Sequence, residues 1–319
     1  MRQQRQPASP SLLPAKRGAL YYLRKDRFLY LLILPGLLYY VVFKYLPMFG
    51  IVIAFKDYQP FMGLEGIFSS EWVGLHHFKR FFMSQFSWQL IRNTLLISVL
   101  KLFWGFPAPI ILALMLNEVR QRRFKKVVQT ISYLPHFLST VIVCGMIRTL
   151  TSTDGGLINL VLTLLGQEPI FFLGDTRYFR SILVISDIWQ SVGWGSIVYL
   201  AAMTGIDTEL YEAAEVDGAS WLQKMWTITL PGIMPVVSIM LIFRVGNLLS
   251  GGFEQILLLY SPMVYSVADL ISTYVYREGL VNMKYSFTTA IDLFTSLVAM
   301  ILVLGTNWLA KKAGQEGIW

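Results

Sequence analysis

The segment ELYEAAEVDGASWLQKMWTITLP, residues 209–231, is polar at its start, yet it lies between two strongly apolar stretches of the chain. Asp207 or Thr208 can cap the N-terminus of a helix here, and the acidic residues that follow suit the first turns of a helix because the helix dipole favours negative charge there. Gly218 is typical of a left-handed helix stop. We therefore expect a short helix that ends at this glycine.

A second short helix should follow directly. Ser220 and Gln223 have the spacing of a capping box, in which each side chain bonds the backbone N–H of the other residue. Pro231 disfavours helical conformation in the residue before it, which predicts a turn into the next apolar segment. The segment thus predicts two short helices joined at a glycine, and the rest of the chain must explain why they are there.

The composition is that of a membrane protein with several spans. Of its 319 residues, 55% are hydrophobic and only 14% are charged, with a mean hydropathy of +0.54. Soluble domains carry about a quarter charged residues. The net charge of +8 comes from basic clusters beside apolar segments, which indicates lipid headgroups as their partners and argues against nucleic acid.

Six segments are long and apolar enough to cross a bilayer, which takes about 20 residues. The first contains Pro35, Lys44 and Pro47, which predict a kink in its outer half. The second contains two prolines that neighbouring helices must accommodate, and the end of the fifth is the least defined. The expected spans are residues 28–54, 90–116, 127–150, 180–204, 230–250 and 287–310.

Lysines and arginines give the orientation. They cluster before the first span, in the sequence VRQRRFKK at residues 119–126, and after the last span. By the positive-inside rule these regions are cytoplasmic, so both termini and the loop of residues 205–229 are expected inside the cell, with the protein in the cell (inner) membrane. We divide the chain into a basic cytoplasmic arm (1–27), a six-helix transmembrane domain (28–312) and a cytoplasmic tail (313–319). The sequence contains no pattern typical of a cleaved signal peptide.

Several other classes of protein have little support. The single cysteine, Cys144, cannot form a disulfide within the chain, and of the three histidines His76 and His77 are adjacent and therefore do not share a helical face as a metal pair would. No phosphate-binding loop or nucleophile–base pair indicates an enzyme. An ion-coupled secondary transporter stays open as the alternative, although only Asp187 and Asp292 are clear acids within spans and no internal repeat is evident.

The first short helix has a smooth face. Ala213 and Ala214 give it a low profile flanked by Tyr211 and Val216, which suits insertion into a groove of another protein. The other possibility is an amphipathic helix lying on lipid. Four carboxylates against one lysine, Lys224, would be repelled by an anionic inner leaflet, so we favour the protein partner.

The spacing of this segment resembles a known motif. E-A-A, three residues, Gly, nine residues and I-x-L-P is the coupling motif of ABC importer membrane subunits, and its positions here are Glu212, Ala213, Ala214, Gly218, Ile228, Leu230 and Pro231. The stretches at residues 29–61, 92–119, 129–137 and 252–260 resemble carbohydrate-importer permeases of the maltose type, in particular the LplB/YteP type. The resemblance extends over residues 25 to 319.

This resemblance implies an all-α, type I ABC importer permease fold and a division of labour. A separate cytoplasmic ATPase dimer would hold ATP and magnesium, while this chain would hold no cofactor. The loop would sit in a cleft of that ATPase, with Glu212 as polar anchor, the two alanines as contact face and Gly218 as the turn. Tyr211, Asp217, Leu230 and Pro231 complete the expected coupling site. A second homologous permease and an extracytoplasmic solute-binding protein are the other implied partners.

The substrate site is expected on the spans that flank this loop. Asp187, Gln190, Ser191 and Trp194 fall on one helical stripe, and Arg244 and Asn247 share a face of the fifth span. Amides and carboxylates suit sugar hydroxyls, an indole suits a sugar ring, and Arg244 suits a carboxylate. The resemblance to maltose-type importers supports an oligosaccharide, and Arg244 allows an acidic one of the alginate or rhamnogalacturonan type. Alternatively, Asp187 and Arg244 are a structural ion pair, and the tryptophan only packs.

Overall fold

The computed structural model describes residues 25, 27–249, 252–315 and 317–318. Within these residues the regular elements are all helices, and the bridge between Lys56 and Trp72 is an isolated one. The all-α prediction is confirmed. Most of the expected N-terminal arm lies outside the described residues. The chain divides into two units, residues 1–52 and 53–319.

The first span is a 29-residue helical segment, Arg27–Phe55. It consists of α2 (Arg27–Tyr40), a π-helical turn (Val41–Tyr45), α3 (Leu46–Met48) and a 3-10 helix (Phe49–Phe55). Pro47 cannot donate a backbone hydrogen bond, and the widened turn directly before it, closed by Leu46 N–H on Val41 O, accommodates that loss. The helix thus changes type around Lys44 and Pro47, whereas Pro35 lies inside α2, and a kink of the outer half stays a prediction.

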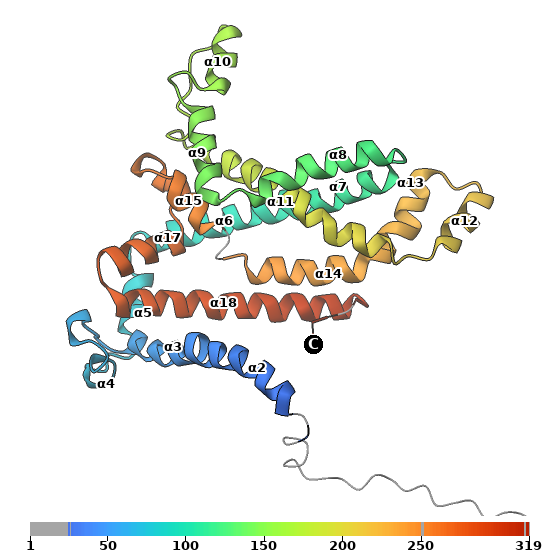
Figure 1. Ribbon diagram of the computed structural model, residues 1–319. Helices are drawn as coiled ribbons and strands as arrows, with labels where there is room; N and C mark the ends of the chain where they lie inside the picture. The colour runs from blue at the N-terminus through green and yellow to red at the C-terminus, as the bar shows by residue number, and fades with distance from the viewer. Residues whose placement is uncertain (1–24, 26, 250–251, 316, 319) are drawn as a thin grey trace, which may run out of the picture. The chain divides into compact units, whose positions relative to one another are not determined.

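Helix α11 (Phe179–Met203) is the centre of the second unit. It packs against α6 (Ser87–Gly105), α7 (Pro107–Glu118), α8 (Arg122–Tyr133) and α14 (Leu230–Gly246), and α14 packs in turn on α18 (Tyr285–Lys312) (Figure 1). Helices α6 and α7 form one continuous span, in which Pro107 takes the first position of α7 and therefore costs no helical hydrogen bond. The second, fourth and sixth expected spans are confirmed.

The third expected span, residues 127–150, is wrong as a single crossing helix. Helix α8 ends at Tyr133, a 3-10 turn (Leu134–Phe137) follows, and α9 (Thr140–Thr151) leaves at 102° to the preceding segment. Pro135 lies in the turn, and Ser139 starts α9 afresh by accepting a hydrogen bond from Ile142 N at 3.3 Å. Helix α8 lies against α11 in close backbone contact: a Cβ at Gly193 of α11 would lie only 2.0 Å from Ser132 O of α8.

The fifth span begins earlier than expected. Helix α13 (Trp221–Lys224) continues through a π-helical turn (Met225–Thr229) into α14, giving one segment from Trp221 to Gly246. The turn predicted at Pro231 is therefore wrong: Leu230 is helical, and its N–H bonds Met225 O, five residues back. The wide π turn lets the helix absorb a proline that has no N–H to donate.

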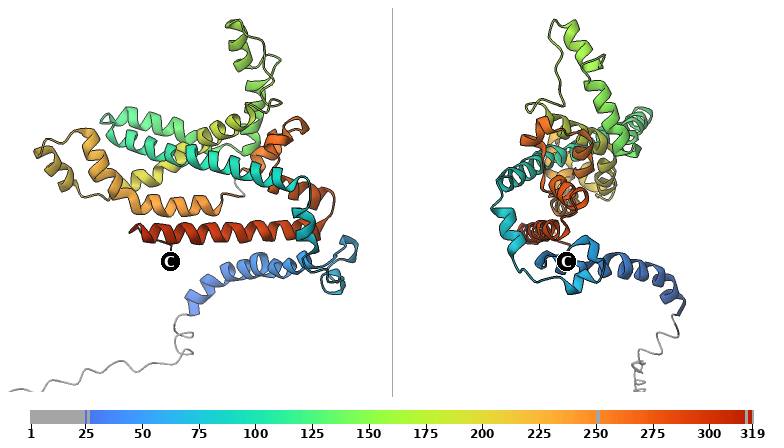
Figure 2. Two further views of the ribbon diagram at one scale, coloured as in Figure 1. Left: turned by 180° about the vertical axis from the view of Figure 1, so that it is seen from behind. Right: turned by 90° about the vertical axis from the view of Figure 1, so that its left-hand side faces the viewer.

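The short helices gather at the two ends of this unit. Helices α12 (Thr208–Val216) and α13 lie at one end, while α5 (His76–Phe82), α15 (Phe253–Leu259) and α17 (Ile271–Tyr276) lie at the other (Figures 1 and 2). Helix α10 (Leu157–Leu164) continues the projecting arm that α9 begins. The remaining short elements are α4 (Gly66–Ser69), α16 (Tyr265–Ala268), 3-10 helices at Pro60–Met62 and Pro262–Val264, and a π turn at Arg277–Val281.

Candidate functional site

One carboxylate on α11 is shared by two cations from different helices. Asp187 Oδ1 accepts a hydrogen bond from Lys101 Nζ at 3.0 Å, and its Oδ2 accepts one from Arg244 Nη2 at 3.0 Å. Lys101 belongs to α6 and Arg244 to the last turn of α14. The ion pair of Asp187 and Arg244, the alternative to a role of both in substrate binding, is present, and the structure adds Lys101 to it.

The two cations differ in how firmly they are held. The side chain of Lys101 is only 6% exposed and also donates to Gln255 Oε1 at 2.8 Å, and Gln255 in turn donates to Ser186 Oγ at 2.7 Å. The Arg244 side chain is 39% exposed. A Cβ on Gly252, whose φ is +93°, would lie 2.5 Å from Lys101 Nζ, so glycine is needed there for this close approach. Lys101 is thus the fixed partner of Asp187, and Arg244 is the accessible one.

Lys101 was missed in the sequence, although a signal was present. It is a lone lysine inside the apolar run of the second span, and ionisable groups at such depth are costly and usually functional. Gln255 gave no comparable signal because a glutamine in an extramembrane connection is ordinary.

The ion pair borders a small cavity. Its volume is about 110 Å³, and Asn247, which donates to Phe243 O at 3.0 Å, lines it together with Asp187 and Arg244. Three of the six predicted substrate residues therefore meet at one cavity. The full lining is Ser98, Lys101, Leu102, Asp187, Arg244, Asn247, Leu248 and Gly252.

The other three predicted substrate residues do not line this cavity. Gln190 donates to Leu138 O at 3.1 Å, and Ser191 donates to Asp187 O in its own helix at 2.7 Å. The Trp194 ring stacks on His136 with centroids 4.7 Å apart, as the packing alternative anticipated. The contacts of Gln190 and Trp194 hold the bend between α8 and α9 against α11. A role of these three residues in substrate binding stays a prediction.

The segment of residues 207–231 forms the two expected helices. Asp207 caps α12 by accepting from Glu209 N at 3.0 Å, and the capping box of Ser220 and Gln223 starts α13. Gly218 has a φ of +74°, and the N–H groups of Gly218 and Ala219 bond Glu215 O and Ala214 O in a Schellman motif. The local prediction for this segment is confirmed up to Lys224.

Two side-chain contacts make the helix pair a stiff unit. Lys224 Nζ bonds Glu215 Oε1 at 2.7 Å across the glycine turn, and Tyr211 OH bonds Thr229 Oγ1 at 2.9 Å, which ties α12 to the start of the fifth span. The hydrogen bond from Lys224 lowers the pKa of the Glu215 carboxyl below its ordinary value. Val216 is 90% exposed, so the pair presents an apolar side chain beside its carboxylates.

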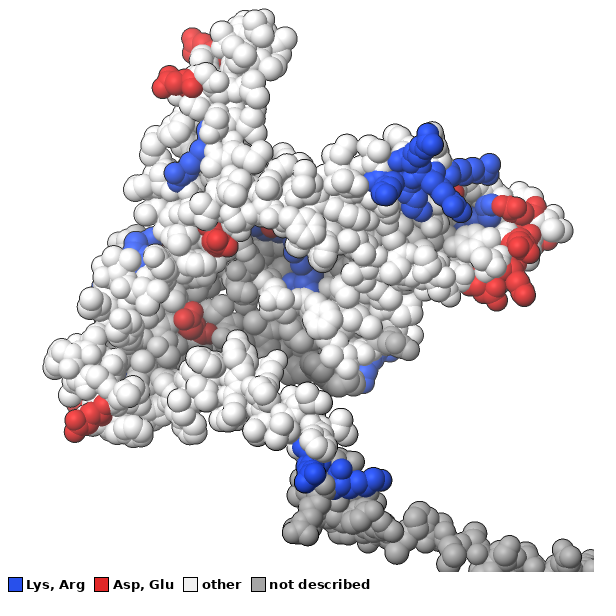
Figure 3. All heavy atoms as spheres, in the orientation of Figure 1, with Lys and Arg blue, Asp and Glu red and all other residues white. Residues whose placement is uncertain are grey.

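Opposite charges face each other at this end of the unit. The basic side chains at the connection of α7 and α8 lie beside the acidic side chains of α12 (Figure 3). Their clustering at one end matches the expectation that both segments lie on the same side of the membrane.

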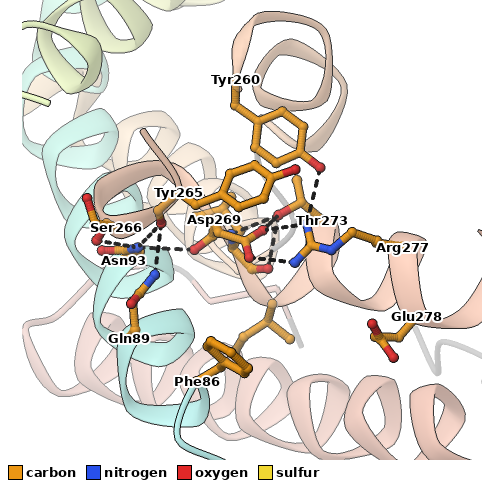
Figure 4. A network of polar contacts seen from close by, with 12 residues as sticks. Phe86, Gln89, Asn93, Tyr260, Tyr265, Ser266, Asp269, Thr273, Arg277 and Glu278 are labelled. Carbon is orange, nitrogen blue, oxygen red and sulfur yellow. Dashed lines mark hydrogen bonds and ion pairs between the residues drawn. The ribbon is translucent and has the colours of Figure 1, made fainter. Parts of the chain in front are cut away.

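A second polar network fastens the far end of the unit (Figure 4). Asn93 on α6 is fully buried and donates to the carbonyl oxygens of Tyr265, Ser266 and Asp269 at 3.2–3.4 Å. The Asp269 carboxylate pairs with Arg277 at 2.7 Å, and this bond contributes to raising the pKa of Arg277 although burial acts against it. The polar side chains of this network bond groups of the same chain, and none of their buried nitrogen or oxygen atoms lacks a partner. The network therefore indicates an anchor for α15–α17 rather than a ligand site.

The described residues contain no group of three or more His, Cys, Asp or Glu side chains arranged to hold a metal ion.

Comparison with known proteins identifies the family. Residues 105–314 match the family described as "Binding-protein-dependent transport system inner membrane component". The chain is 48% identical over 297 residues to Protein LplB of Bacillus subtilis (strain 168), covering 93% of this chain and 92% of that protein. It is also 48% identical over 304 residues to the polygalacturonan/rhamnogalacturonan transport system permease protein YteP of the same strain, covering 95% of this chain and 94% of YteP.

A solved structure has the same fold. One chain in the crystal structure of a bacterial alginate ABC transporter, in complex with an alginate pentasaccharide-bound periplasmic protein, superposes with a TM-score of 0.87 at 41% identity. The match covers 94% of this chain and 99% of that chain. These findings exclude the secondary-transporter alternative. The chain therefore belongs to the family of inner membrane components of binding-protein-dependent transport systems, and it is a membrane permease subunit of an ABC importer.

Proposed function

We propose that this permease imports acidic oligosaccharides, which it receives from an extracytoplasmic solute-binding protein and releases into the cytoplasm. The observation that carries the proposal is the charge of its cavity. Two cations, Lys101 and Arg244, share the single carboxylate of Asp187, so the cluster holds one positive charge in excess. An uncompensated charge is costly inside a membrane protein. A uronate carboxylate on the substrate would neutralise it.

Arg244 is the residue placed to receive that carboxylate. Its guanidinium lines the cavity and is the more exposed of the two cations, and a guanidinium can bind a carboxylate through two parallel hydrogen bonds. Asp187 would keep Lys101 as its partner when Arg244 turns to the substrate. Asn247 offers an amide to a sugar hydroxyl, and Asp187 can accept from one. The acidic polymers named for YteP and for the alginate transporter are consistent with this chemistry.

The cavity also supports a partnership with a second permease. At about 110 Å³ it is smaller than the roughly 300–1,000 Å³ of small-molecule sites. One chain therefore supplies part of the wall, and a second homologous permease would supply the rest. Gln190, Ser191 and Trp194 lie further along α11 toward α12, where they would line the path to the cytoplasm.

The helix pair α12–α13 is the proposed contact with a cytoplasmic ATPase dimer, which would hold ATP and magnesium. Its acidic side chains, the low-profile Ala213 and the exposed Val216 suit a groove on a protein partner. The Tyr211–Thr229 hydrogen bond would pass movement of the pair directly to the fifth span, which carries Arg244. With α12 in the cytoplasm, we expect residues 120–126 and both termini on that side too, by the positive-inside rule.

Uptake into proteoliposomes tests both parts of the proposal. The complete transporter, reconstituted with its binding protein and ATP inside the vesicles, should import labelled trigalacturonate. Arg244→Ala should reduce that uptake far more than uptake of the neutral methyl ester of the same trisaccharide. Ala213→Arg should abolish uptake of both while leaving the amount of inserted protein unchanged. Equal losses for acid and ester in Arg244→Ala would favour a purely structural ion pair.

A further inference from the structure

A second cavity lies at the end of the unit away from α12 and α13, and it shares no residue with the cavity at Asp187. Its volume is about 400 Å³, within the range of small-molecule sites. Residues of three segments line it: the loop of residues 57–61, helix α5, and residues 282–287 at the start of α18. Under the proposed orientation it opens on the extracytoplasmic side, where substrate arrives.

The walls of this outer cavity are held together by hydrogen bonds between backbone groups and side chains. Tyr58 N–H donates to Ser286 Oγ at 3.0 Å, which joins the loop to α18. The buried His77 ring on α5 donates from Nε2 to Lys56 O at 3.0 Å, which joins the loop to α5. Met283 is the non-glycine residue with positive φ, at 56°, in the described chain. Such backbone strain persists only where the surroundings hold it, and it is concentrated at functional sites.

The chemistry of the lining is that of an acidic sugar site. Arg80 lies 4.8 Å over the ring of Phe287, and in the described part of the chain no carboxylate comes within ion-pair distance of it. Lys284, by contrast, is already paired with Glu278 at 2.5 Å. Tyr58 offers an aromatic face and Asp57 an acceptor for hydroxyl groups. One guanidinium is therefore available for an anion, next to groups that bind a sugar ring.

We propose that this cavity is an entry subsite that binds one uronate residue of an acidic oligosaccharide, with Arg80 on the carboxylate, Tyr58 against the ring and Asp57 on a hydroxyl. The nature of the sugar rests on the proposed function, whereas the site itself rests on the cavity. The subsite would hold the chain end of the substrate before it reaches Arg244.

Direct binding to the complete transporter tests this subsite. The complex is placed in lipid nanodiscs without binding protein or ATP, in an Arg244→Ala background that removes the inner carboxylate site. Trigalacturonate binding is then followed by saturation-transfer NMR. Arg80→Gln should weaken binding by about tenfold, the size expected for losing one charge-assisted hydrogen bond. Lys79→Gln, on the same helix but outside the lining, should leave it unchanged, and Arg80→Lys should restore part of it.

Three outcomes would overturn the subsite. Equal affinity in Arg80→Gln and its parent removes it, and an equal loss for the neutral methyl ester assigns Arg80 to cavity shape instead of carboxylate binding. Unchanged sugar binding with weakened docking of the binding protein would assign Arg80 to a protein contact. A matching thermal unfolding midpoint for Arg80→Gln and Lys79→Gln excludes misfolding. Failure of the proposed function looks different, because the transporter with Arg244 and Arg80 intact would then fail to import the acid.

Discussion

Replacing Lys101 with methionine should trap Arg244 on Asp187 and so impair binding of an acidic substrate. In the native cluster Asp187 has a cation on each oxygen, so Arg244 can leave without exposing an unneutralised carboxylate. Without Lys101, Arg244 is the remaining partner in the cluster. A substrate carboxylate must then compete with Asp187 for the same guanidinium.

The size of the effect follows from the geometry. At 3.0 Å and an effective dielectric constant of about 20, the direct attraction between Lys101 and Asp187 is about 5.5 kcal/mol, and desolvation offsets part of it. Leaving a buried charge without its partner costs about 3–5 kcal/mol. Because Asp187 keeps 24% of its side chain exposed, we expect a smaller penalty of about 2–3 kcal/mol. That corresponds to a roughly 30- to 140-fold higher concentration of the acidic sugar at half-maximal uptake.

The assay is concentration-dependent uptake of trigalacturonate into proteoliposomes, with its methyl ester as the neutral control. Lys101→Met should raise the concentration of the acid at half-maximal uptake. The value for the ester should change by no more than about twofold, since the ester has no carboxylate to bind Arg244. Adding Asp187→Asn removes the competing carboxylate and should restore acid uptake. Two results would contradict this reasoning: uptake of the acid by the double variant that is no higher than by Lys101→Met alone, or an equal loss of uptake for acid and ester. Either result would mean that Lys101 supports the fold and not the release of Arg244.

Three further changes test the surrounding structure. Gly218→Ala should lower the free energy of unfolding by about 1 kcal/mol, because a φ of +74° is unfavourable for a residue with a side chain even though the space there is open. It should also lower ATP-driven uptake more than Gly218→Asn does, because asparagine tolerates this conformation better. Asn93→Ala should lower the thermal unfolding midpoint well below that of Gln89→Ala. The first change removes three hydrogen bonds of a fully buried amide, one of them to the buried Asp269, whereas the second removes one half-buried bond. Burial acts to raise the pKa of Glu278, but the hydrogen bond from Lys284 outweighs this effect, and the pKa in the folded protein lies below 4.5. The stability that this pair contributes is therefore complete above pH 4.5 and is lost as the pH falls through the lower folded pKa. Glu278→Gln should flatten the acid side of the profile of unfolding free energy against pH. An identical acid profile in both proteins would contradict that assignment.

The helix pair at residues 207–224 could be predicted because its signals are local. The cap at Asp207, the glycine stop and the capping box each involve residues at most a few positions apart, so the sequence contains both partners of every bond. The course of the chain after Lys224 was predicted less well. Proline rules describe an α-helix, whereas here a π turn supplies the room that Pro231 needs.

The bend after α8 and the role of Lys101 could not be read in the same way. Residues 127–150 are apolar enough for one span, and Pro135 alone did not reveal a bend, because prolines at 107 and 231 are accommodated within continuous spans. What distinguishes the bend is contact between distant segments, with Gly193 giving α8 close access to α11. Lys101 lies 86 residues from Asp187 in sequence, so its partner emerged only with the fold.

The excess positive charge at the Asp187 cavity could be neutralised in two chemically distinct ways once a second permease completes the wall. An acidic side chain of that partner would neutralise Arg244 in every state of the transport cycle, and the cavity would then favour neutral sugars. A substrate carboxylate would neutralise it only when the cavity is loaded, so the empty cavity would keep its positive charge and attract the next acid. The firm attachment of Lys101 and the exposure of Arg244 favour the second solution. If Arg244 were permanently paired with an acidic side chain, Asp187 would not need Lys101 as a second cation. If Arg244 pairs with a substrate carboxylate only while the cavity is loaded, Lys101 must neutralise Asp187 during that time.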